Sequence, residues 1–317
     1  RVISTPSSRS SRIGTGSVVA TGLGKVILLG EHAVVYGHAA LAMGLDRGAS
    51  AEGVLGVGAS ELRLPSWDRT VRADRSSDEP LARAFAAIVG EGAPVVVTAN
   101  AAIPAGAGLG CSAALGVAVA RAVGEARGET LGDAEAIERA MAWERVFHGN
   151  PSGIDATLAA LGGVMLFQKG APAVRVRLRG PLVAVVADTN EPSATKDMVE
   201  SVRRQREEDP ARVAKVFDGI EALVRNGRAS LEAGDLGALG KLLDLNQTLL
   251  ASLLLSTPSV ERLVAAARGA GALGAKLTGA GGGGCVVALA GDAASADRIE
   301  AALRNESPTV LRAEVTP

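Results

Sequence analysis

The stretch GAGLGCSAA, from Gly106 to Ala114, alternates glycine with other residues and then runs into a long alanine-rich segment. A helix N-terminus carries unpaired backbone N–H groups and the positive end of the helix dipole, so it attracts anions. Glycine lets the backbone approach such an anion closely. The stretch therefore fits a loop that holds phosphate groups at the start of a helix. An ordinary glycine-rich connection is an equally good interpretation of the loop alone.

Two common phosphate-binding motifs do not fit this loop. A P-loop requires a lysine after its last glycine, whereas Cys111 follows Gly110 here. The dinucleotide fingerprint requires G-x-G-x-x-G directly after a strand, but this loop reads G-x-G-x-G and follows NAAIPA. The cations that a phosphate needs must therefore come from a metal or from distant basic residues, which makes acidic metal ligands the next feature to seek.

One such acidic residue is Glu144, in the segment DAEAIERAMAWERVFH. This segment has a helical pattern from Asp133 to His148, with Asp133 placed to act as its N-cap. At about 100° per residue, Glu144 falls within a largely apolar stripe together with Ile137, Ala140, Met141 and His148. Because a buried carboxylate is costly unless it is paired or bound to a metal, this position favours a metal ligand over a structural salt bridge.

Asp155 follows in the turn-rich segment HGNPSGID. An aspartate at a turn is most simply a helix cap when it is considered alone. Beside Glu144 and a phosphate loop it becomes a candidate catalytic base.

The composition limits the class of protein. The chain has 317 residues, of which 47% are apolar and 21% charged, and its formal net charge is -1. These values indicate a folded core and argue against nucleic acid or an anionic membrane as the main partner. No apolar run reaches the length of a membrane span. The two cysteines, Cys111 and Cys285, lie in separate glycine-rich stretches, which argues against a disulfide framework and favours the reducing cytoplasm.

Hydrophobic patterns and turn signals predict the order of the elements. In the first half we expect a strand, a glycine turn, a second strand and a turn within 17–37, a strand at 93–103, helices at 112–127 and 133–148, and a strand pair within 162–180. In the second half we expect a strand at 181–190, helices at 195–227, 229–254 and 259–268, a strand–loop–strand unit at 271–291, a helix at 293–304 and a strand at 308–315.

A glycine-proline pair before a fresh strand places a domain boundary near Gly180. The organisation that we expect is a flexible lead-in at 1–16, an N-terminal domain at 17–180 and a C-terminal domain at 181–317. The lead-in is rich in arginine and serine and free of acidic residues.

Four blocks in this order together resemble the GHMP kinase family. They are GKVILLGEHAVVYG (24–37), PAGAGLGCSAA (104–114), ERVFHGNPSGID (144–155) and KLTGAGGGGC (276–285). The third block resembles the branch of the family that acts on mevalonate. The resemblance implies an α+β fold of two domains with the active site in the cleft between them. It also implies that the reaction is ATP-dependent phosphorylation of the 5-hydroxyl of (R)-mevalonate.

The resemblance also implies how ATP and Mg²⁺ are held. Residues of the glycine loop and the helix after it would bind the ATP phosphates: Pro104, Gly106, Gly108, Leu109, Gly110, Cys111, Ser112 and Ala113. Ser112 and Glu144 would hold Mg²⁺ against the phosphates. The helix end and the backbone amides would then replace the lysine of a P-loop.

The same resemblance assigns the acceptor side. Asp155 would accept the proton of the substrate hydroxyl, and Lys25 would stabilise the developing alkoxide and help to keep Asp155 ionised. The residues expected to line the substrate are Lys25, Glu31, His32, Asp155, Thr195, Gly279 and Ala280. Ser193 stands where relatives often carry a basic residue, so the contacts to the mevalonate carboxylate are left unassigned.

Cys111 stands where the family pattern has serine. A helix N-terminus can lower the pKa of a thiol, so we expect alkylation of Cys111 to inactivate the enzyme and ATP to protect it.

Two alternatives stay open. One is another GHMP enzyme, such as phosphomevalonate kinase, galactokinase, homoserine kinase or a decarboxylase that acts on a diphosphate. The other is a nucleotide-binding regulator on an inactive kinase scaffold, although the candidate base and metal ligands are all present. The family suggests a monomer or a homodimer.

Overall fold

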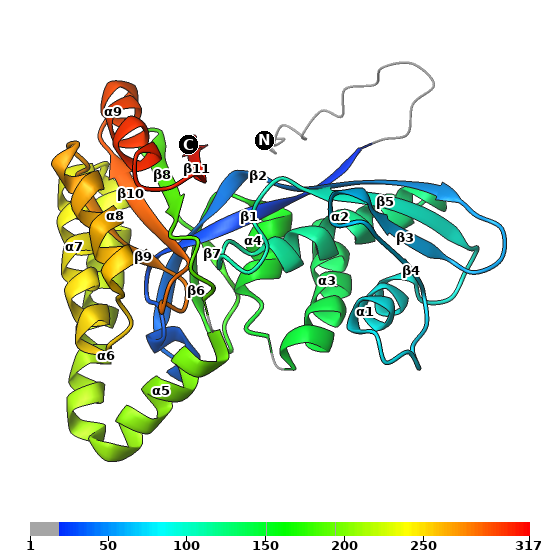
Figure 1. Ribbon diagram of the computed structural model, residues 1–317, viewed down its shortest axis with the longest axis horizontal. Helices are drawn as coiled ribbons and strands as arrows, with labels where there is room; N and C mark the ends of the chain where they lie inside the picture. The colour runs from blue at the N-terminus through cyan, green and yellow to red at the C-terminus, as the bar shows by residue number, and fades with distance from the viewer. Residues whose placement is uncertain (1–18, 150, 194) are drawn as a thin grey trace, which may run out of the picture.

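The protein is described here by a computed structural model of residues 19–149, 151–193 and 195–317, and the expected lead-in at 1–16 lies outside them. Its strands form two sheets (Figure 1). Sheet A has the order β4-β3-β5-β2-β6-β7, with β1 paired to β2, and sheet B has the order β11-β8-β10-β9.

The strands of sheet A are β1 (Ala20–Leu29), β2 (Ala39–Leu55), β3 (Glu61–Leu64), β4 (Arg69–Arg72), β5 (Val95–Ala101), β6 (Val164–Gln168) and β7 (Val174–Arg175). The strands of sheet B are β8 (Leu182–Asp188), β9 (Gly274–Thr278), β10 (Cys285–Ala290) and β11 (Val310–Val315). The expected boundary near Gly180 falls between the last strand of sheet A and the first strand of sheet B.

The long strand β2 organises sheet A. Its residues Ala39–Met43 pair with β6, and its residues Ala49–Leu55 pair with β5. Strand β1 lies antiparallel to β2 from Leu41 to Ala51. In sheet B every pairing is antiparallel within the described residues.

The predicted glycine turn within 17–37 is wrong, because β1 continues through Gly22 and Gly24 as one strand. These glycines allow a close approach instead. A Cβ on Gly22 would lie 2.1 Å from the carbonyl oxygen of Ala114, in the helix that packs on β1. A Cβ on Gly24 would lie 3.1 Å from the carbonyl oxygen of Leu109. The chain turns at Gly30, where φ is +110°, and enters the short 3-10 helix η1 (Ala33–Tyr36).

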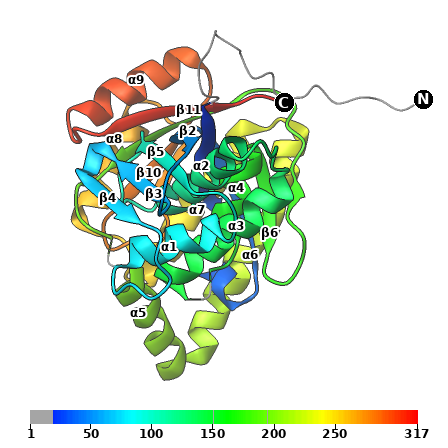
Figure 2. The same cartoon turned by 90° about the vertical axis from the view of Figure 1, so that its right-hand side faces the viewer.

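Helices cover one face of sheet A (Figure 2). They are α1 (Pro80–Val89), α2 (Cys111–Ala126), α3 (Asp133–His148) and α4 (Ile154–Leu161). The predicted bounds of α3 are confirmed, but its N-cap is Gly132. The Asp133 carboxylate instead accepts a hydrogen bond from Arg121 of α2, with an N···O distance of 2.7 Å.

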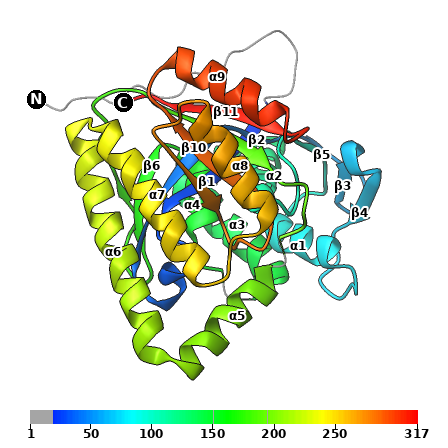
Figure 3. The same cartoon turned by 60° about the vertical axis from the view of Figure 1, so that its left-hand side comes forward.

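Three helices of the second half pack against sheet B: α7 (Leu236–Ser252), α8 (Pro258–Gly269) and α9 (Ala293–Arg304) (Figure 3). Helix α6 (Pro210–Ala233) packs against α7 and against strands of sheet A, and α5 (Thr195–Glu208) packs against α6. None of the described helices has both the length and the apolar character needed to cross a membrane.

The predicted helices at 195–227 and 229–254 are wrong in their bounds, because the chain breaks at Asp209 and Gly234. Asp209 caps α6 by accepting a hydrogen bond from the N–H of Arg212, and Pro210 follows at the first helical position. Gly234 ends α6 in the left-handed region at φ +79°, and Asp235 caps α7. The predicted helix at 293–304 is confirmed as α9.

One apolar core joins the two sheets. It includes Leu28 and Leu41 of sheet A together with Leu182 and Val287 of sheet B, all buried. Helix α6 also reaches sheet A, because a Cβ on its Gly227 would lie 2.4 Å from a methyl carbon of Leu29. The relative position of the sheets is therefore set by packed side chains.

Leu254, between α7 and α8, has a left-handed backbone with φ +60° although its side chain is 77% exposed. Its neighbours Leu253 and Leu255 are fully buried. For a residue with a Cβ this conformation costs roughly 1–2 kcal/mol, and an exposed side chain recovers little of that by burial. The strain at Leu254 is imposed by its two anchored neighbours.

We therefore expect Leu254→Gly to raise the free energy of unfolding by about 1 kcal/mol, measured by urea denaturation. The matched control is Leu245→Gly, which changes a 54% exposed leucine inside α7. That variant should lower the free energy of unfolding by about 1 kcal/mol, because glycine is a poor helix former. A loss of stability in both variants would show that no strain is relieved at Leu254.

Candidate active site

The glycine loop leads directly into α2. Gly106, Gly108 and Gly110 have φ values of +78°, +79° and +74°, which favour glycine at all three positions. Gly110 is the N-cap of α2 and offers no side chain to the first N–H groups of the helix. The loop thus presents a helix N-terminus that is suited to an anion.

Lys25 and Asp155 meet beside this loop. The backbone N–H of Lys25 donates to the carbonyl oxygen of Leu109 at 2.9 Å. The Lys25 side chain passes so close to the loop that a Cβ on Gly110 would lie 3.0 Å from its Cγ. Its Nζ lies 3.2 Å from Oδ1 of Asp155, in the first turn of α4. The structure therefore brings the two predicted catalytic residues together.

Glu144 faces inward on α3, and its side chain meets the start of α2. The hydroxyl of Ser112 donates to Oε1 of Glu144 at 2.5 Å, and Nε1 of Trp143 donates to that hydroxyl at 3.1 Å. Glu144 is only 3% exposed. Burial raises the pKa of the Glu144 carboxyl, the negative charge of Asp155 also raises it, and the hydrogen bond from Ser112 opposes this. A cation near Glu144 would therefore favour its ionised form.

The donor set at this place fits a magnesium ion that is shared with a nucleotide. Among the described residues, no group of three or more His, Cys, Asp or Glu side chains could hold a metal by itself. Mg²⁺ is commonly bound through one or two carboxylates together with substrate phosphates and water. Oxygen ligands from Ser112 and Glu144 beside an anion-binding helix end match that pattern.

A cavity of about 430 Å³ opens next to the glycine loop. Its lining is mainly apolar and aromatic and comprises Trp67, Arg69, Glu79, Pro80, Leu81, Ala105, Gly106, Cys111, Ser112, Leu115, Trp143, Phe147 and His148. Trp67 comes from the 3-10 helix η2 (Pro65–Trp67), and the rings of Trp143 and Phe147 lie 5.6 Å apart on α3. The cavity can take a flat heterocycle whose phosphates extend to α2.

The aromatic residues of this cavity were not predicted from the sequence. Trp67 and Trp143 are far apart in the sequence, and only the fold brings them to the same cavity. The one local signal was the i, i+4 spacing of Trp143 and Phe147 on α3, which is equally typical of core packing.

Glu31 is placed differently from the expectation. It is fully buried, its carboxylate pairs with Nζ of Lys276, and it accepts a hydrogen bond from Nδ2 of Asn246 at 2.9 Å. It therefore does not face a substrate. His32 is 5% exposed with φ 58°, and its Nε2 lies 2.8 Å from the carbonyl oxygen of Ala280. Burial lowers the pKa of His32.

The loop between β9 and β10, Gly279–Gly284, packs against the phosphate loop. A Cβ on Gly279 would lie 3.7 Å from Cα of Gly108, and one on Gly284 would lie 3.4 Å from the carbonyl oxygen of Ala107. Gly279 thus lies next to the phosphate loop, and the expected contact of Gly279 and Ala280 with the substrate stays a prediction. Thr195 begins α5 and is exposed.

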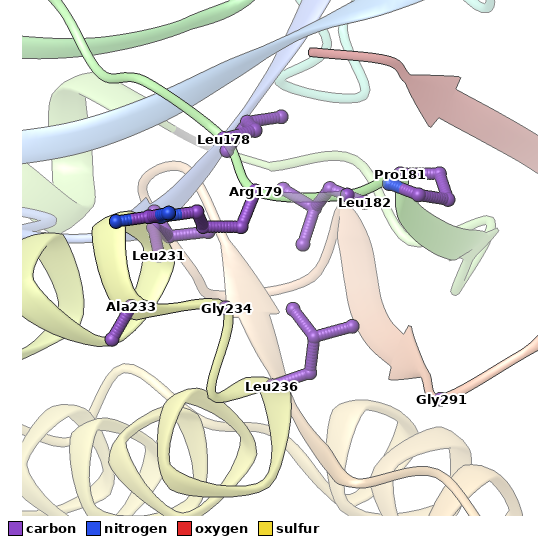
Figure 4. Close-up of a pocket in the computed structure, with 10 residues that line it drawn as sticks. Leu178, Arg179, Pro181, Leu182, Leu231, Ala233, Gly234, Leu236 and Gly291 are labelled. Carbon is purple, nitrogen blue, oxygen red and sulfur yellow. The ribbon is translucent and has the colours of Figure 1, made fainter.

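A second cavity, of about 350 Å³, lies between the segment that leads into β8 and the turn between α6 and α7 (Figure 4). It is lined by Leu178, Arg179, Gly180, Pro181, Leu182, Leu231, Ala233, Gly234, Leu236 and Gly291. Arg179 uses its Nε to donate to the carbonyl oxygen of Glu232 near the end of α6, at 3.0 Å. The residues predicted for the active site all lie outside this lining.

Comparison with known proteins assigns the family. Residues 79–163 match the GHMP kinases N terminal domain, and residues 228–309 match GHMP kinases C terminal. A mevalonate kinase of Aeropyrum pernix is 33% identical over 280 residues, covering 84% of this chain and 86% of the relative. The chain belongs to the GHMP kinase family. A mevalonate kinase of Thermococcus sibiricus is 34% identical over 302 residues, covering 86% of this chain and 89% of the relative.

The fold comparison agrees with this family. The crystal structure of L. major mevalonate kinase in complex with R-mevalonate superimposes with a TM-score of 0.83 at 29% identity, covering 95% of this chain and 97% of that chain. The predicted α+β GHMP kinase fold with N- and C-terminal domains is confirmed. Within the GHMP kinases the chain groups with the mevalonate kinases over most of its length.

The expected reactivity of Cys111 needs correction. Although it is the first residue of α2, it is 6% exposed, and burial together with the negative charge of Glu144 raises the pKa of its thiol to about 11. Desolvation outweighs the helix end here. Cys285 is also buried, and its pKa is raised as well.

We therefore expect iodoacetamide to modify Cys111 slowly at pH 7 and faster as the pH rises towards 11, because only the thiolate reacts. ATP should slow the reaction further, since Cys111 lines the cavity. Peptide mapping by mass spectrometry gives both rates, with Cys285, which lies outside the cavity lining, as the internal control. Rapid and complete modification of Cys111 at pH 7 would contradict the raised pKa.

Proposed function

We propose that this chain transfers the terminal phosphoryl group of ATP to the 5-hydroxyl of (R)-mevalonate, giving 5-phosphomevalonate and ADP. The observation that carries the proposal is the contact of Lys25 with Asp155 beside the α2 N-terminus. An acid–base pair at a phosphate loop is what a hydroxyl acceptor requires. The choice of mevalonate is supported by relatives that carry the name mevalonate kinase along most of the chain.

ATP would span the aromatic cavity and the glycine loop. The nucleotide base would lie against the exposed ring of Trp67, and the phosphates would extend to the first N–H groups of α2. Both places border the same residues, because Gly106 and Ser112 line the cavity as well as the loop. Apolar stacking would hold the base, while backbone dipoles would hold the phosphates.

Ser112 and Glu144 would hold Mg²⁺. When bound, the ion would neutralise phosphate oxygens and keep the phosphoryl group in line with its acceptor. Because burial raises the pKa of Glu144, ionised Glu144 and bound Mg²⁺ would favour each other. Trp143 would keep the Ser112 hydroxyl oriented through its indole N–H.

Asp155 would accept the proton of the mevalonate hydroxyl as the new O–P bond forms. Its side chain is 39% exposed, so it is open to an acceptor, whereas the side chain of Lys25 is 7% exposed. Lys25 would stabilise negative charge on the attacking oxygen and hold Asp155 in place. Such a base contributes roughly 10²–10⁴-fold to the rate.

Thr195 would lie near the transferred phosphoryl group, at the start of α5. Support comes from its neighbour Ser193, whose hydroxyl donates to the carbonyl oxygen of Gly281 at 2.9 Å. Gly279 and Ala280 would border the substrate from the same loop. Because Cys111 and Cys285 are free and buried, we also propose that the protein works in the reducing cytoplasm, as a monomer or homodimer.

We expect the wild-type protein to release ADP from Mg-ATP with (R)-mevalonate, and not with phosphomevalonate, galactose or homoserine. Asp155→Asn should lower kcat by about 10²–10⁴-fold, because the proton acceptor is lost while the shape is kept. A coupled ADP assay measures both. Turnover with another acceptor would contradict the choice of mevalonate, and ATP binding without any turnover would favour a regulator.

The two tryptophans of the sequence, Trp67 and Trp143, both line the proposed base site. Intrinsic fluorescence should therefore change on addition of Mg-ATP, and Trp67→Phe should weaken ATP binding by about 2–12-fold while leaving kcat within about 3-fold, because stacking contributes roughly 0.5–1.5 kcal/mol beyond burial. Val57→Ala, which changes a fully exposed residue in the loop between β2 and β3, is the control. An unchanged ATP affinity in Trp67→Phe would show that the nucleotide base does not bind in this cavity.

A further inference from the structure

Two oppositely charged side chains lie deep in the protein and have no part in the proposed chemistry. Glu31 and Lys276 are both fully buried and form an ion pair. Nζ of Lys276 also donates to the carbonyl oxygens of Leu277 and Ile27, the latter at 3.4 Å. The pair thus connects the turn after β1 with strand β9.

Stability alone is a poor explanation for this pair. Removing two charges from water costs so much that apolar residues of similar volume are often equally stable or better. The cluster carries a second cost, because Oδ1 of Asn246 is buried without a hydrogen-bond partner among the described residues. Burial also raises the pKa of Glu31 and lowers that of Lys276, and each charge opposes the shift of the other. Because the Glu31–Lys276 ion pair is costly to bury and depends on direction, its role is better explained by the accurate placement of the segments that it joins.

The pair is one of three polar contacts that join the same two segments. The hydroxyl of Thr278 accepts a hydrogen bond from the N–H of Ile27 at 2.8 Å and lies 3.1 Å from the carbonyl oxygen of Ile27. His32 contacts the carbonyl oxygen of Ala280 at 2.8 Å. Residues 27–32 and residues 276–280 therefore form a seam that is held by three separate polar contacts.

Both segments of this seam lead to the active site. Ile27 is two residues from Lys25 on β1, so the Ile27–Thr278 contact fixes the strand that carries Lys25. Thr278 precedes Gly279, which packs against Gly108 of the phosphate loop. A shift of β9 along β1 would change how the Gly279–Gly284 loop faces the phosphates.

We infer that Glu31 and Lys276 are positioning residues, which set the register of β9 and the Gly279–Gly284 loop against Lys25 and the phosphate loop. This inference rests on the proposed function, and in it Glu31 makes no contact with the substrate. The pair also anchors His32, whose left-handed backbone needs a fixed neighbour on each side. Glu31, the preceding residue, is held by its ion pair with Lys276, and the His32 ring is held by its contact with the carbonyl oxygen of Ala280.

The experiment compares Glu31→Met, Lys276→Met and the double variant. Each single variant should unfold at a lower temperature than the wild type, because an unpaired charge stays buried. The double variant should recover most of that loss, because both charges are gone. Its kcat with Mg-ATP and (R)-mevalonate should nevertheless stay about 10–100-fold below the wild type, since a displacement of about 1 Å can cost that much.

ATP affinity separates positioning from a general loss of structure. The proposed base cavity is built from residues 67–148 alone, so tryptophan fluorescence should give an ATP affinity for the double variant within about 3-fold of the wild type. Ile299→Ala, in the buried core of α9, is the matched control for lower stability. It should lower the melting temperature and leave kcat unchanged at 25 °C. Recovery of both stability and kcat in the double variant would overturn the inference.

A milder variant covers the case in which the double variant does not fold. Glu31→Asp keeps the charge and shortens the side chain by one methylene, so it should lower kcat several-fold with ATP affinity unchanged. An unchanged kcat in this variant would also overturn the inference. If the wild type turns over no acceptor, the proposed function fails separately. Hydrogen exchange of the backbone amides of 279–284 then tests the seam. Glu31→Asp should make this exchange faster, and an unchanged exchange rate would refute the positioning role of Glu31.

Discussion

The close contact between β1 and the start of α2 is the constraint on which the site depends. Gly22 and Gly24 let the helix and its loop approach the strand to distances that a Cβ would not allow. The backbone N–H of Lys25 can then reach the carbonyl oxygen of Leu109. The position of Lys25 beside the loop therefore depends on packing between two elements that are distant in sequence.

Glu31 and Glu144 are both buried carboxylates, but the protein compensates their burial in different ways. Both are acidic, nearly inaccessible and raised in pKa by burial. Glu31 has a permanent cation in Lys276, so its charge is satisfied within the protein. Glu144 accepts a hydrogen bond from the neutral hydroxyl of Ser112 and lies 3.7 Å from His148, and no lysine or arginine among the described residues forms an ion pair with it. A buried carboxylate is available to a metal only when the fold leaves it without its own cation.

The sequence predicted the parts of the site whose signal is local. The glycine loop, the helix from Asp133 to His148 and the inward position of Glu144 follow from spacing alone, and the structure agrees with each. The glycines of β1 were wrongly predicted to form a turn. Glycine is favoured both in turns and where a distant helix approaches a strand closely, so the residue type alone does not distinguish the two cases. Trp67 and the pairing of Glu31 with Lys276 depend on contacts across the fold, for which the order of residues carries no signal.

The residues of the candidate active site are distributed unequally between the two halves of the chain. Lys25, the phosphate loop, Glu144, Asp155 and the aromatic cavity all belong to the sheet A half, whereas the second half brings a glycine loop and the start of α5. If this half binds the nucleotide and carries the metal ligands and the catalytic base, as proposed, it still needs a wall to exclude water and complete the acceptor side. Glycine can form that wall only if its backbone is placed accurately, because it has no side chain to compensate for a shift. The buried contacts between β1 and β9 supply that accuracy, which explains why costly polar groups lie in a seam that apolar residues could have filled.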